Sequence, residues 1–527
     1  MMAARTGSKT LDLTLYLVTD STPAILGHKS LTDVVEEALK GGVTLVQYRE
    51  KHADTGAMIR VASELHRVTE RYGVPLLIND RVDVCLAVGA EGVHIGQDDM
   101  AISQARGLLG PKATIGVTAS SIEEARAAIE GGADYLGIGT MFPTPTKTDT
   151  KAIIGTRGTQ AILDACDTGT AKSVPCVAIG SINASNVQRV LHQSALGENR
   201  LNGVAIVSAI MASSDPQRAA RELKNAITAT REKVDLVHAP AVEPLASVSE
   251  MVAKVPSIVK AHATSSVLCH NMTNTVVQNF VANVCLATGS SPIMSLNGAE
   301  AADLAQLGGA LVVNMGTVTP EILDAYLAGL RAYNAVGSPV VFDPVGGGAT
   351  TARKNVVKTL MAGGYFHLIK GNEGEISAVA GTSSVQQRGV DSGPSTATGN
   401  EKAALVKEIA RRERCVVLMT GATDYLSDGS RTLAVSNGSH WLGRITGSGC
   451  ALGAVTASYM AVHQEDRLIA VLSGLLHYEL AAERAEKRCS GPGSFIPTFL
   501  DELYLLGQEF RDGRYSSLQS DARVRAV

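Results

Sequence analysis

The chain has 527 residues, of which 45% are hydrophobic and 19% are charged, and its formal net charge is −4. This length exceeds what one ordinary hydrophobic core supports, so two or three globular domains are expected. Because the charge is small and no basic tract occurs, the composition excludes an electrostatic binding surface for nucleic acid or a membrane.

The first half of the chain alternates short β-rich runs with helical stretches rich in Ala, Glu and Leu. Strands that alternate with helices predict βαβ units and a parallel sheet. Eight such units in about 240 residues match the size of a (β/α)8 barrel, the TIM-barrel fold. The expected strands are 14–19, 43–48, 75–79, 92–95, 113–118, 134–138, 175–179 and 203–207.

Polar or small residues stand at or just after the end of each of these runs. In a (β/α)8 barrel the carboxyl ends of the strands and the loops that follow them form the active face. The pattern therefore predicts one shared site at the mouth of the barrel. Its members are Asp20, Arg49, Asp80, Asp99, Thr118, Lys147, Gly180 and Ser208.

Residues 231–255 combine prolines with mixed polarity, which indicates a linker. We place the barrel domain at 1–238, the linker at 239–255 and a second domain at 256–527. Each half is long enough to bury a core of its own.

The second half alternates again, but its strands have neither the number nor the spacing that closes a barrel. The pattern predicts an open, doubly wound α/β sandwich. Residues 382–400 are polar and of low complexity, which indicates a surface loop. The expected strands lie near 266–269, 310–314, 339–343, 366–370, 415–420 and 431–436.

The segment 47–51 (QYREK) directs alternate side chains to one side of an extended strand end. Gln47, Arg49 and Lys51 therefore point together, as a grip on a polyphosphate requires. Carboxylates in the segments 79–80 (ND) and 97–99 (QDD) end the next two strands. Mg²⁺ typically binds through one or two carboxylates together with waters and substrate phosphates, so these carboxylates can share one ion.

Two further groups of residues are expected at this mouth. A proline-stiffened loop carries two hydroxyls and a lysine that would donate to the same anion. The last two strands end where barrels commonly bind a phosphate through backbone N–H groups. Such a site suits a transfer in which diphosphate leaves and a phosphorylated nucleophile attacks. The residues are Thr144, Thr146 and Lys147 on the loop, and Gly180, Ser181, Val207 and Ser208 after the strands.

These motifs resemble those of the thiamine phosphate synthases, whose QxREK, ND, GQxD and PTxTK signatures occur here in order. The resemblance implies that 4-amino-2-methyl-5-pyrimidinylmethyl diphosphate loses diphosphate and is captured by the nitrogen of 4-methyl-5-(2-phosphoethyl)thiazole. Such a reaction depends on stabilising the charge of the leaving group. The implied residues are Gln47, Arg49, Lys51, Asn79, Thr144, Thr146, Lys147, Gly180, Val207 and Ser208 for substrates, Lys147 and Thr118 for catalysis, and Asp80 and Asp99 for Mg²⁺.

Thr118 stands where many of these synthases carry Ser, and it keeps the hydroxyl group. His94 lies between Val93 and Ile95 and is interpreted as a packed core histidine.

The thiazole tautomerases of the same fold family are an alternative for this half. The complete set of cations and carboxylates favours a synthase.

In the second half, the segment 447–450 (GSGC) precedes a helix of small residues. A glycine-rich turn that opens a helix presents free N–H groups and the positive end of the helix dipole to an anion. In phosphoryl transfer this anion is the migrating γ-phosphate. Asp343 ends a strand before several glycines, and Asn372 and Glu375 follow another strand, where they could hold Mg²⁺ or its waters.

Residues 255–510 resemble the hydroxyethylthiazole kinases of the ribokinase-like superfamily, which implies phosphorylation of 4-methyl-5-(2-hydroxyethyl)thiazole with ATP. The motifs are HNMTNTVVQN (270–279), SPIM (291–294), DPVGGGAT (343–350), KGNEGE (370–375), TGSGC (446–450) and GPGSF (491–495). The implied residues are Asn274, Val276 and Met294 in the thiazole pocket, Gly447, Gly449 and Cys450 at the anion site, Asp343, Lys370, Asn372, Thr420 and Gly447 at the nucleotide, and Glu375 at Mg²⁺.

Two roles remain open for Cys450, which stands where many ribokinase-like enzymes carry an Asp base. A helix N-terminus depresses the pKa of a thiol, so Cys450 could accept the proton of the alcohol. Alternatively, positioning and metal electrostatics dominate the reaction, and the thiol only fills space.

We therefore interpret the chain as a bifunctional enzyme of thiamine biosynthesis in which the kinase product is the nucleophile of the synthase, with Mg²⁺ and ATP. A kinase for hydroxymethylpyrimidine and a non-catalytic thiamine sensor are the alternatives, disfavoured by the thiazole motif and by the intact site residues. The resemblance implies a homo-oligomer, trimer or hexamer, built through the second half. The eight cysteines include no CxxC pair and no secretory leader precedes them, which predicts a reduced, cytoplasmic protein.

Overall fold

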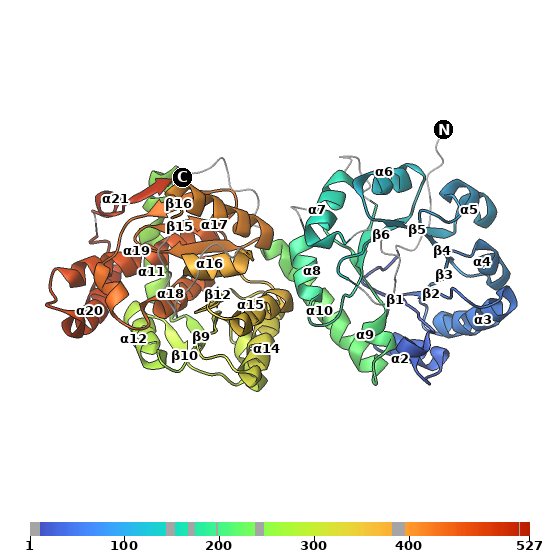
Figure 1. Cartoon of the computed structure of the whole chain (residues 1–527), viewed down its shortest axis with the longest axis horizontal. Coiled ribbons are helices and arrows are strands. Elements are labelled where there is room, and N and C mark those ends of the chain that lie inside the picture. The colour runs from blue at the N-terminus through green and yellow to red at the C-terminus, as the bar shows by residue number, and fades with distance from the viewer. Residues whose placement is uncertain are drawn as a thin grey trace. The chain divides into compact units, whose positions relative to one another are not determined.

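The computed structural model describes residues 11–143, 153–166, 174–195, 199–237, 247–381, 396–515 and 517–527. The chain divides into two compact units, Met1–Val234 and Asp235–Val527. Each unit is built around its own sheet (Figure 1).

The first unit is a closed barrel of eight parallel strands in the order β1 to β8. The barrel closes where β1 pairs with β8, with Leu15 opposite Val204. The predicted TIM barrel is confirmed, and every strand lies within two residues of its expected bounds. The strands are β1 Leu15–Val18, β2 Leu45–Tyr48, β3 Leu76–Asn79, β4 Gly92–Ile95, β5 Thr114–Ala119, β6 Tyr135–Ile138, β7 Cys176–Ile179 and β8 Gly203–Ile206.

Helices surround the barrel strands, as Figure 1 shows. Their apolar faces cover the outer surface of the strands, while Ser30 and Ser121 cap the helices that follow them. The helices are α1 Pro23–Leu26, α2 Leu31–Lys40, α3 Thr55–Arg71, α4 Val82–Val88, α5 Ile102–Leu109, α6 Ile122–Glu130, α7 Gly155–Cys166, α8 Val187–Ser194, α9 Ser208–Met211 and α10 Pro216–Val237.

The alternation of side chains along each strand gives the barrel two apolar layers. On β1, Leu15 and Leu17 pack outward against the helices, whereas Tyr16 and Val18 belong to the cluster inside the barrel. Tyr135 of β6 joins this inner cluster. Bulky polar side chains therefore lie beneath the mouth of the barrel, where they can hold a site in place.

The second unit has one mixed nine-stranded sheet in the order β10-β9-β11-β12-β13-β14-β15-β16-β17. Pairing is parallel from β10 to β14 and antiparallel from β14 to β17. The predicted open α/β sandwich is confirmed. The strands are β9 Leu268–Met272, β10 Ser291–Ile293, β11 Ala310–Asn314, β12 Val340–Asp343, β13 Leu368–Asn372, β14 Val416–Thr420, β15 Asp424–Ser427, β16 Thr432–Val435 and β17 Val524–Ala526.

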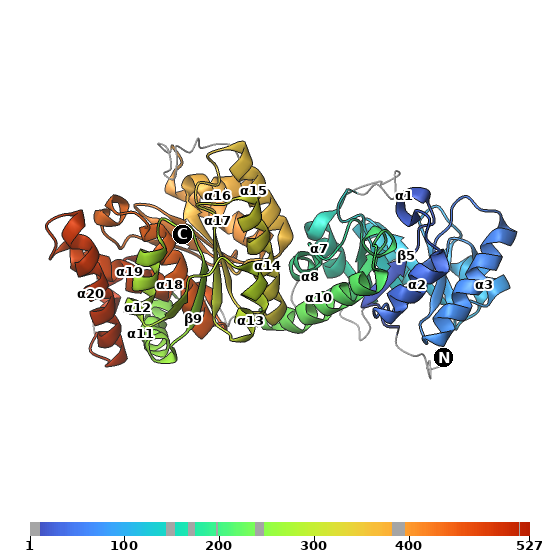
Figure 2. The same ribbon diagram turned by 90° about the horizontal axis from the view of Figure 1, so that it is seen from below.

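Helices cover both faces of this sheet (Figure 2). One face packs against α14 Pro320–Val336, α15 Thr351–Gly363, α16 Glu373–Ala380 and α17 Gly399–Glu413. The other packs against α11 Val248–Ser265, α12 Gln278–Thr288, α18 Ser448–Val462, α19 Arg467–Glu486 and α20 Pro492–Arg511. The short helices α13 Ala301–Gln306 and α21 Leu518–Asp521 complete the unit.

Helix α18 lies directly on the sheet because its residues are small. It contacts β11 and β12, and a Cβ atom at Gly453 would lie 3.6 Å from Asp343 Oδ2. Residues 451–460 are all buried. This close packing places the amino end of α18 beside the carboxyl ends of the central strands.

Some sequence predictions of the second half need correction. The linker expected at 239–255 overlaps α11, which begins at Val248 and is capped by Ser247. Strands β10, β15 and β17 were not predicted. Of the loop expected at 382–400, residues 382–395 lie outside the described residues, and Gly399 already begins α17.

Across the described ranges, none of the helices is both long enough and apolar enough to cross a membrane.

Candidate active sites

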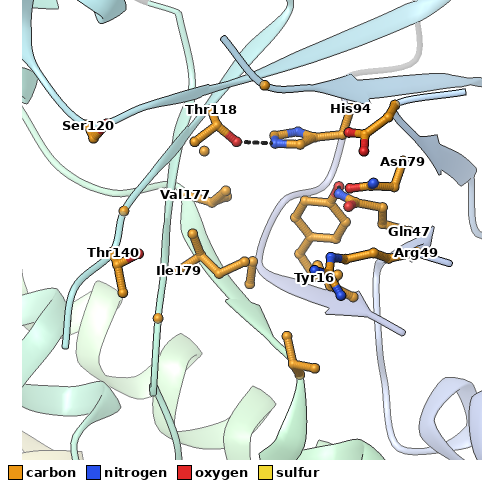
Figure 3. Close-up of a pocket in the computed structure, with 18 of the residues that line it drawn as sticks. Tyr16, Gln47, Arg49, Asn79, His94, Thr118, Ser120, Thr140, Val177 and Ile179 are labelled. Carbon is orange, nitrogen blue, oxygen red and sulfur yellow. Dashed lines mark hydrogen bonds between the residues drawn. The ribbon is translucent and has the colours of Figure 1, made fainter. Parts of the chain in front are cut away.

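A cavity of about 370 Å³ opens at the carboxyl ends of the barrel strands. Figure 3 shows side chains from several strands converging on it. The structure brings together most of the residues predicted for this half, while Thr144, Thr146 and Lys147 lie outside the described residues. The predicted residues that line the cavity are Gln47, Arg49, Lys51, Asn79, Asp80, Asp99, Thr118, Gly180, Val207 and Ser208.

Cations and carboxylates alternate along one side of this cavity. Lys51 Nζ lies 2.6 Å from Asp80 Oδ2, and Arg49 Nη1 lies 3.8 Å from Asp20 Oδ2. Asp99 Oδ2 accepts a hydrogen bond of 2.7 Å from the backbone N–H of Gly96. Lys51 is half exposed, so its ammonium is available to a ligand as well as to Asp80.

The two predicted metal ligands of the barrel, Asp80 and Asp99, approach each other. Burial raises the pKa of Asp99, and the neighbouring Asp80 carboxyl raises it further. A carboxyl whose pKa is raised by a neighbouring carboxyl fits a divalent cation, because the cation removes this repulsion. Within the described ranges no group of three or more His, Cys, Asp or Glu side chains is arranged for a metal. A cation here would therefore take its other ligands from water and substrate.

His94 is not the packed core histidine that the sequence suggested. It lines the cavity, and its Nε2 lies 2.9 Å from Thr118 Oγ1 (Figure 3). The signal was present in the strand itself, since Val93 and Ile95 pack outward and place His94 inside the barrel. Tyr16 and Tyr135, which underlie the same cavity, also escaped prediction.

The second unit holds a buried cluster where the carboxyl ends of its central strands meet α18. Lys370 Nζ lies 3.3 Å from Asp343 Oδ1, and both side chains are almost fully buried, at 3% and 1% exposure. Asn314 Nδ2 donates to Asp343 Oδ2 at 2.8 Å. Burial by itself would lower the pKa of Lys370, but the carboxyls of Asp343 and Glu375 outweigh it and raise this pKa, so the ammonium stays charged.

Cys450 joins this cluster as an acceptor of hydrogen bonds. Asn314 Nδ2 lies 3.2 Å and Asn274 Nδ2 lies 3.5 Å from its sulfur. Burial raises the pKa of Cys450 to about 11, with a further contribution from Asp343. The net shift of this pKa is therefore upward, opposite to the depression expected from the helix N-terminus, and desolvation of the thiolate is its largest cause. Asn314 was not predicted, although it ends β11 as Asp343 ends β12.

Glu375 has a structural task that the sequence did not reveal. Its Oε1 accepts from Gly346 N–H at 2.9 Å and its Oε2 from Asn372 N–H at 2.8 Å, which forms a capping box for α16. Burial and the nearby Asp343 raise the pKa of Glu375 to about 7.

A second cavity of about 910 Å³ adjoins this cluster. Asn372, Thr420 and Gly449 line it, together with Ser448 at the start of α18. A Cβ atom at Gly449 would lie 3.5 Å from Lys370 Nζ, which places the ammonium beside the amino end of the helix. Gly447 caps this helix at a φ of 89°, a conformation that glycine adopts without strain.

The three residues expected in the thiazole pocket do not share one environment. Asn274 is 5% exposed and bonds to Asn314, whereas Val276 is 70% exposed. Met294 is half-buried against the apolar cluster on the α18 side of the sheet. Within this chain, Val276 lines neither of the two cavities described here.

The structure joins a barrel whose cavity is lined by cations and carboxylates to an α/β sandwich with a buried Asp–Lys pair beside a helix N-terminus, which is the class of a two-domain α/β protein. The model of the thiamine monophosphate synthase family matches residues 15–210. The model of the hydroxyethylthiazole kinase family matches residues 259–509.

Two full-length relatives carry the same two regions. The probable thiamine biosynthetic bifunctional enzyme of Schizosaccharomyces pombe is 42% identical over 512 residues, which cover 95% of this chain and 96% of the relative. The thiamine biosynthetic bifunctional enzyme of Saccharomyces cerevisiae is 37% identical over 536 residues, covering 96% of this chain and 98% of that protein. The chain belongs to the family of fungal thiamine biosynthetic bifunctional enzymes.

Proposed function

We propose that the barrel unit condenses 4-amino-2-methyl-5-pyrimidinylmethyl diphosphate with 4-methyl-5-(2-phosphoethyl)thiazole to give thiamine phosphate and diphosphate. The observation that carries this proposal is the pairing of Lys51 with Asp80 beside Asp99 in one cavity. The C–O bond to diphosphate breaks, and a C–N bond to the thiazole nitrogen forms.

The residues of the cavity would act mainly on the leaving group. Arg49 and Lys51 would bind the diphosphate oxygens, and preorganised cations of this kind stabilise charge as it develops. Asp80 and Asp99 would hold Mg²⁺, which when bound neutralises charge on the diphosphate. Gly180 and Ser208 would present backbone N–H groups to the phosphate of the thiazole.

The variant Lys51→Ala tests the barrel assignment. We expect kcat/KM for condensation to fall by about 10²–10³-fold, the usual loss when one charge-stabilising donor is removed. Lys40→Ala is the matched control, because Lys40 is exposed on α2, where it pairs with neighbouring Glu37. Equal activity of the two variants would contradict the role assigned to Lys51.

We propose that the second unit transfers the γ-phosphoryl group of ATP to 4-methyl-5-(2-hydroxyethyl)thiazole. Support comes from Lys370, whose ammonium lies between buried Asp343 and the amino end of α18. The free N–H groups of that helix end and the ammonium would together stabilise the migrating phosphoryl group. The cavity lined by Asn372, Thr420 and Gly449 would hold the nucleotide.

Metal binding in this unit would centre on Asp343 and Glu375. The nearby Asp343 carboxyl raises the pKa of Glu375, which makes ionisation of Glu375 less favourable. Mg²⁺, when bound, supplies charge neutralisation for the transferred phosphoryl group. The thiazole hydroxyl would lie near Cys450, which at a pKa of about 11 is a neutral thiol and serves as a packing group rather than a base.

The measurement that tests the kinase assignment is ADP formation dependent on hydroxyethylthiazole, compared with hydroxymethylpyrimidine as the acceptor. We expect ADP with the thiazole and little with the pyrimidine. The reverse preference would contradict the proposed substrate.

We propose further that the chain forms a homo-oligomer, trimer or hexamer, through the second unit. Val276 is an exposed apolar residue within a motif implied to bind substrate, and a second copy could cover it. Val276→Asp should reduce the molecular mass measured by light scattering and raise KM for the thiazole. An unchanged mass would contradict this proposal.

The eight cysteines are free thiols, which supports a reducing, cytoplasmic location.

A further inference from the structure

A continuous chain of hydrogen bonds crosses the interior of the barrel beneath the cavity. Gln47 Nε2 donates to Tyr16 Oη, and Tyr16 Oη lies 2.8 Å from Tyr135 Oη. Tyr135 Oη lies 2.8 Å from His94 Nδ1. His94 Nε2 lies 2.9 Å from Thr118 Oγ1, a bond that Figure 3 marks. The five side chains come from β2, β1, β6, β4 and β5, so the chain joins distant parts of the barrel.

The backbone leaves space for this chain at two glycines. A Cβ atom at Gly116 would lie 2.0 Å from Tyr135 Cζ, and one at Gly137 would lie 3.0 Å from His94 Cε1. Tyr16 and Tyr135 are 1% and 0% exposed, and their rings meet edge to face at 5.9 Å. Strands β5 and β6 therefore fix both the tyrosine and the histidine by shape.

The proton positions along the chain follow from its first bond. Because the Gln47 amide donates to Tyr16, the proton of Tyr16 must go to Tyr135, and that of Tyr135 to His94 Nδ1. With Nδ1 accepting from Tyr135, the His94 ring donates from Nε2 to Thr118. The opposite direction would leave the Tyr16 hydroxyl without an acceptor in this chain of bonds, which is costly for a buried group.

The two ends of the chain both line the cavity. At one end, one N–H of Gln47 Nε2 is donated to Tyr16, which orients the amide and leaves its Oε1 as an acceptor. At the other end, Thr118 Oγ1 accepts from His94, which leaves its own proton to be donated. Burial raises the pKa of both Tyr16 and Tyr135, so the phenols between these ends stay protonated.

We propose that Tyr16, Tyr135 and His94 form a relay that fixes the hydrogen-bond polarity of the pyrimidine subsite. The relay makes Thr118 a donor to a ring nitrogen, and the Gln47 amide from which it starts offers Oε1 as an acceptor for the exocyclic amino group. Tyr135 and His94 are thus positioning residues that act through Thr118 and Gln47. This inference rests on the condensation proposed for the barrel unit.

The experiment measures steady-state condensation with the aminopyrimidine diphosphate and with an analogue that lacks the amino group. Wild-type protein should use the analogue about 100-fold less well in kcat/KM. Tyr135→Phe and His94→Leu break the relay, and we expect kcat/KM for the normal substrate to fall about 10- to 100-fold, mainly through KM. In these variants the penalty for the missing amino group should shrink to less than about tenfold, because lost hydrogen bonds of one network are not additive.

Conservative and matched variants separate the relay from a merely structural role. His94→Gln can accept from Tyr135 and donate to Thr118, so it should recover most of the activity and of the discrimination. Tyr72→Phe removes an exposed hydroxyl that contacts Glu36 and should change neither. If Tyr135→Phe does not fold, Tyr16→Phe breaks the neighbouring link.

The outcomes distinguish this inference from the function on which it rests. An unchanged ratio between the two substrates in Tyr135→Phe or Tyr16→Phe and in His94→Leu would overturn the relay, as would failure of His94→Gln to recover discrimination. Absence of condensation by wild-type protein with any substrate would overturn the proposed function itself.

Discussion

Lys370→Met probes the buried ion pair of the second unit most directly. The change removes the ammonium that lies 3.3 Å from Asp343 Oδ1 and keeps a side chain of similar length. Asp343 is 1% exposed. Among the described residues, the amide of Asn314 then remains as the hydrogen-bond donor to its carboxylate. The variant therefore isolates the charge of Lys370 from its shape.

The expected loss of stability is set by what happens to Asp343. Removing one partner of a buried pair usually costs about 3–5 kcal/mol. Because burial already raises the pKa of Asp343, its carboxyl can take up a proton instead of staying charged, and we expect the lower end, about 3 kcal/mol. The double variant Asp343→Asn/Lys370→Met removes both charges of the pair and should return to within about 1 kcal/mol of wild type.

The chain offers a selective probe for this measurement, since its only tryptophan, Trp441, lies in the second unit. Urea unfolding followed by Trp441 fluorescence reports that unit separately from the barrel. Both variants should lose at least about 100-fold in phosphorylation of the thiazole, while condensation of pre-phosphorylated thiazole stays unchanged. A double variant as unstable as Lys370→Met, or one that phosphorylates the thiazole normally, would refute the reasoning.

Three further predictions concern single residues. Cys450→Ala should lose less than about tenfold in kcat of phosphorylation, because a thiol with a pKa of about 11 is not ionised at neutral pH. A loss of about 10²–10⁴-fold would instead identify Cys450 as a general base. The folded state holds the proton of Glu375 more tightly than the unfolded chain, with a pKa of about 7 against 4.5. The contribution of Glu375 to the stability of the second unit is therefore complete below pH 4.5 and falls by up to about 3 kcal/mol as pH rises through 7. Trp441-detected unfolding without Mg²⁺ should show this slope in wild type and a flatter one in Glu375→Gln, and equal slopes would contradict it. Gly116→Ala places a Cβ atom 2.0 Å from Tyr135 Cζ and should lower the free energy of unfolding of the barrel by about 1–3 kcal/mol. Most condensation activity should be lost while kinase activity is retained. Normal condensation by this variant would contradict the prediction.

The sequence predicted the barrel closely because each strand is a short apolar run bounded by polar or small residues. Gln47, Arg49 and Lys51 were expected on one side of a strand end, and all three line one cavity. Period-two alternation in strands is a local property, so no knowledge of distant contacts was needed.

The elements and contacts that escaped prediction depend on distant parts of the chain. Strands β10 and β17 have three residues each, too few for a pattern of their own, and β17 pairs with β16 from about ninety positions away. The bond between Tyr16 and Tyr135 spans 119 positions. The pKa of Cys450 depends on its desolvation among Asn274, Asn314 and Asp343, which the helix-start motif alone does not reveal.

The central claim is that two separate sites act in sequence, and one coupled assay tests it. Thiamine phosphate is measured from hydroxyethylthiazole, Mg²⁺-ATP and the pyrimidine diphosphate, using wild type, Lys51→Ala, Asp343→Asn/Lys370→Met and the control Lys40→Ala. We predict that only wild type and the control form product by themselves. Phosphorylated thiazole should restore product formation by Asp343→Asn/Lys370→Met but not by Lys51→Ala. A mixture of these two inactive variants should form product. Rescue of Lys51→Ala by phosphorylated thiazole, or a kinase variant that stays inactive with it, would contradict the account.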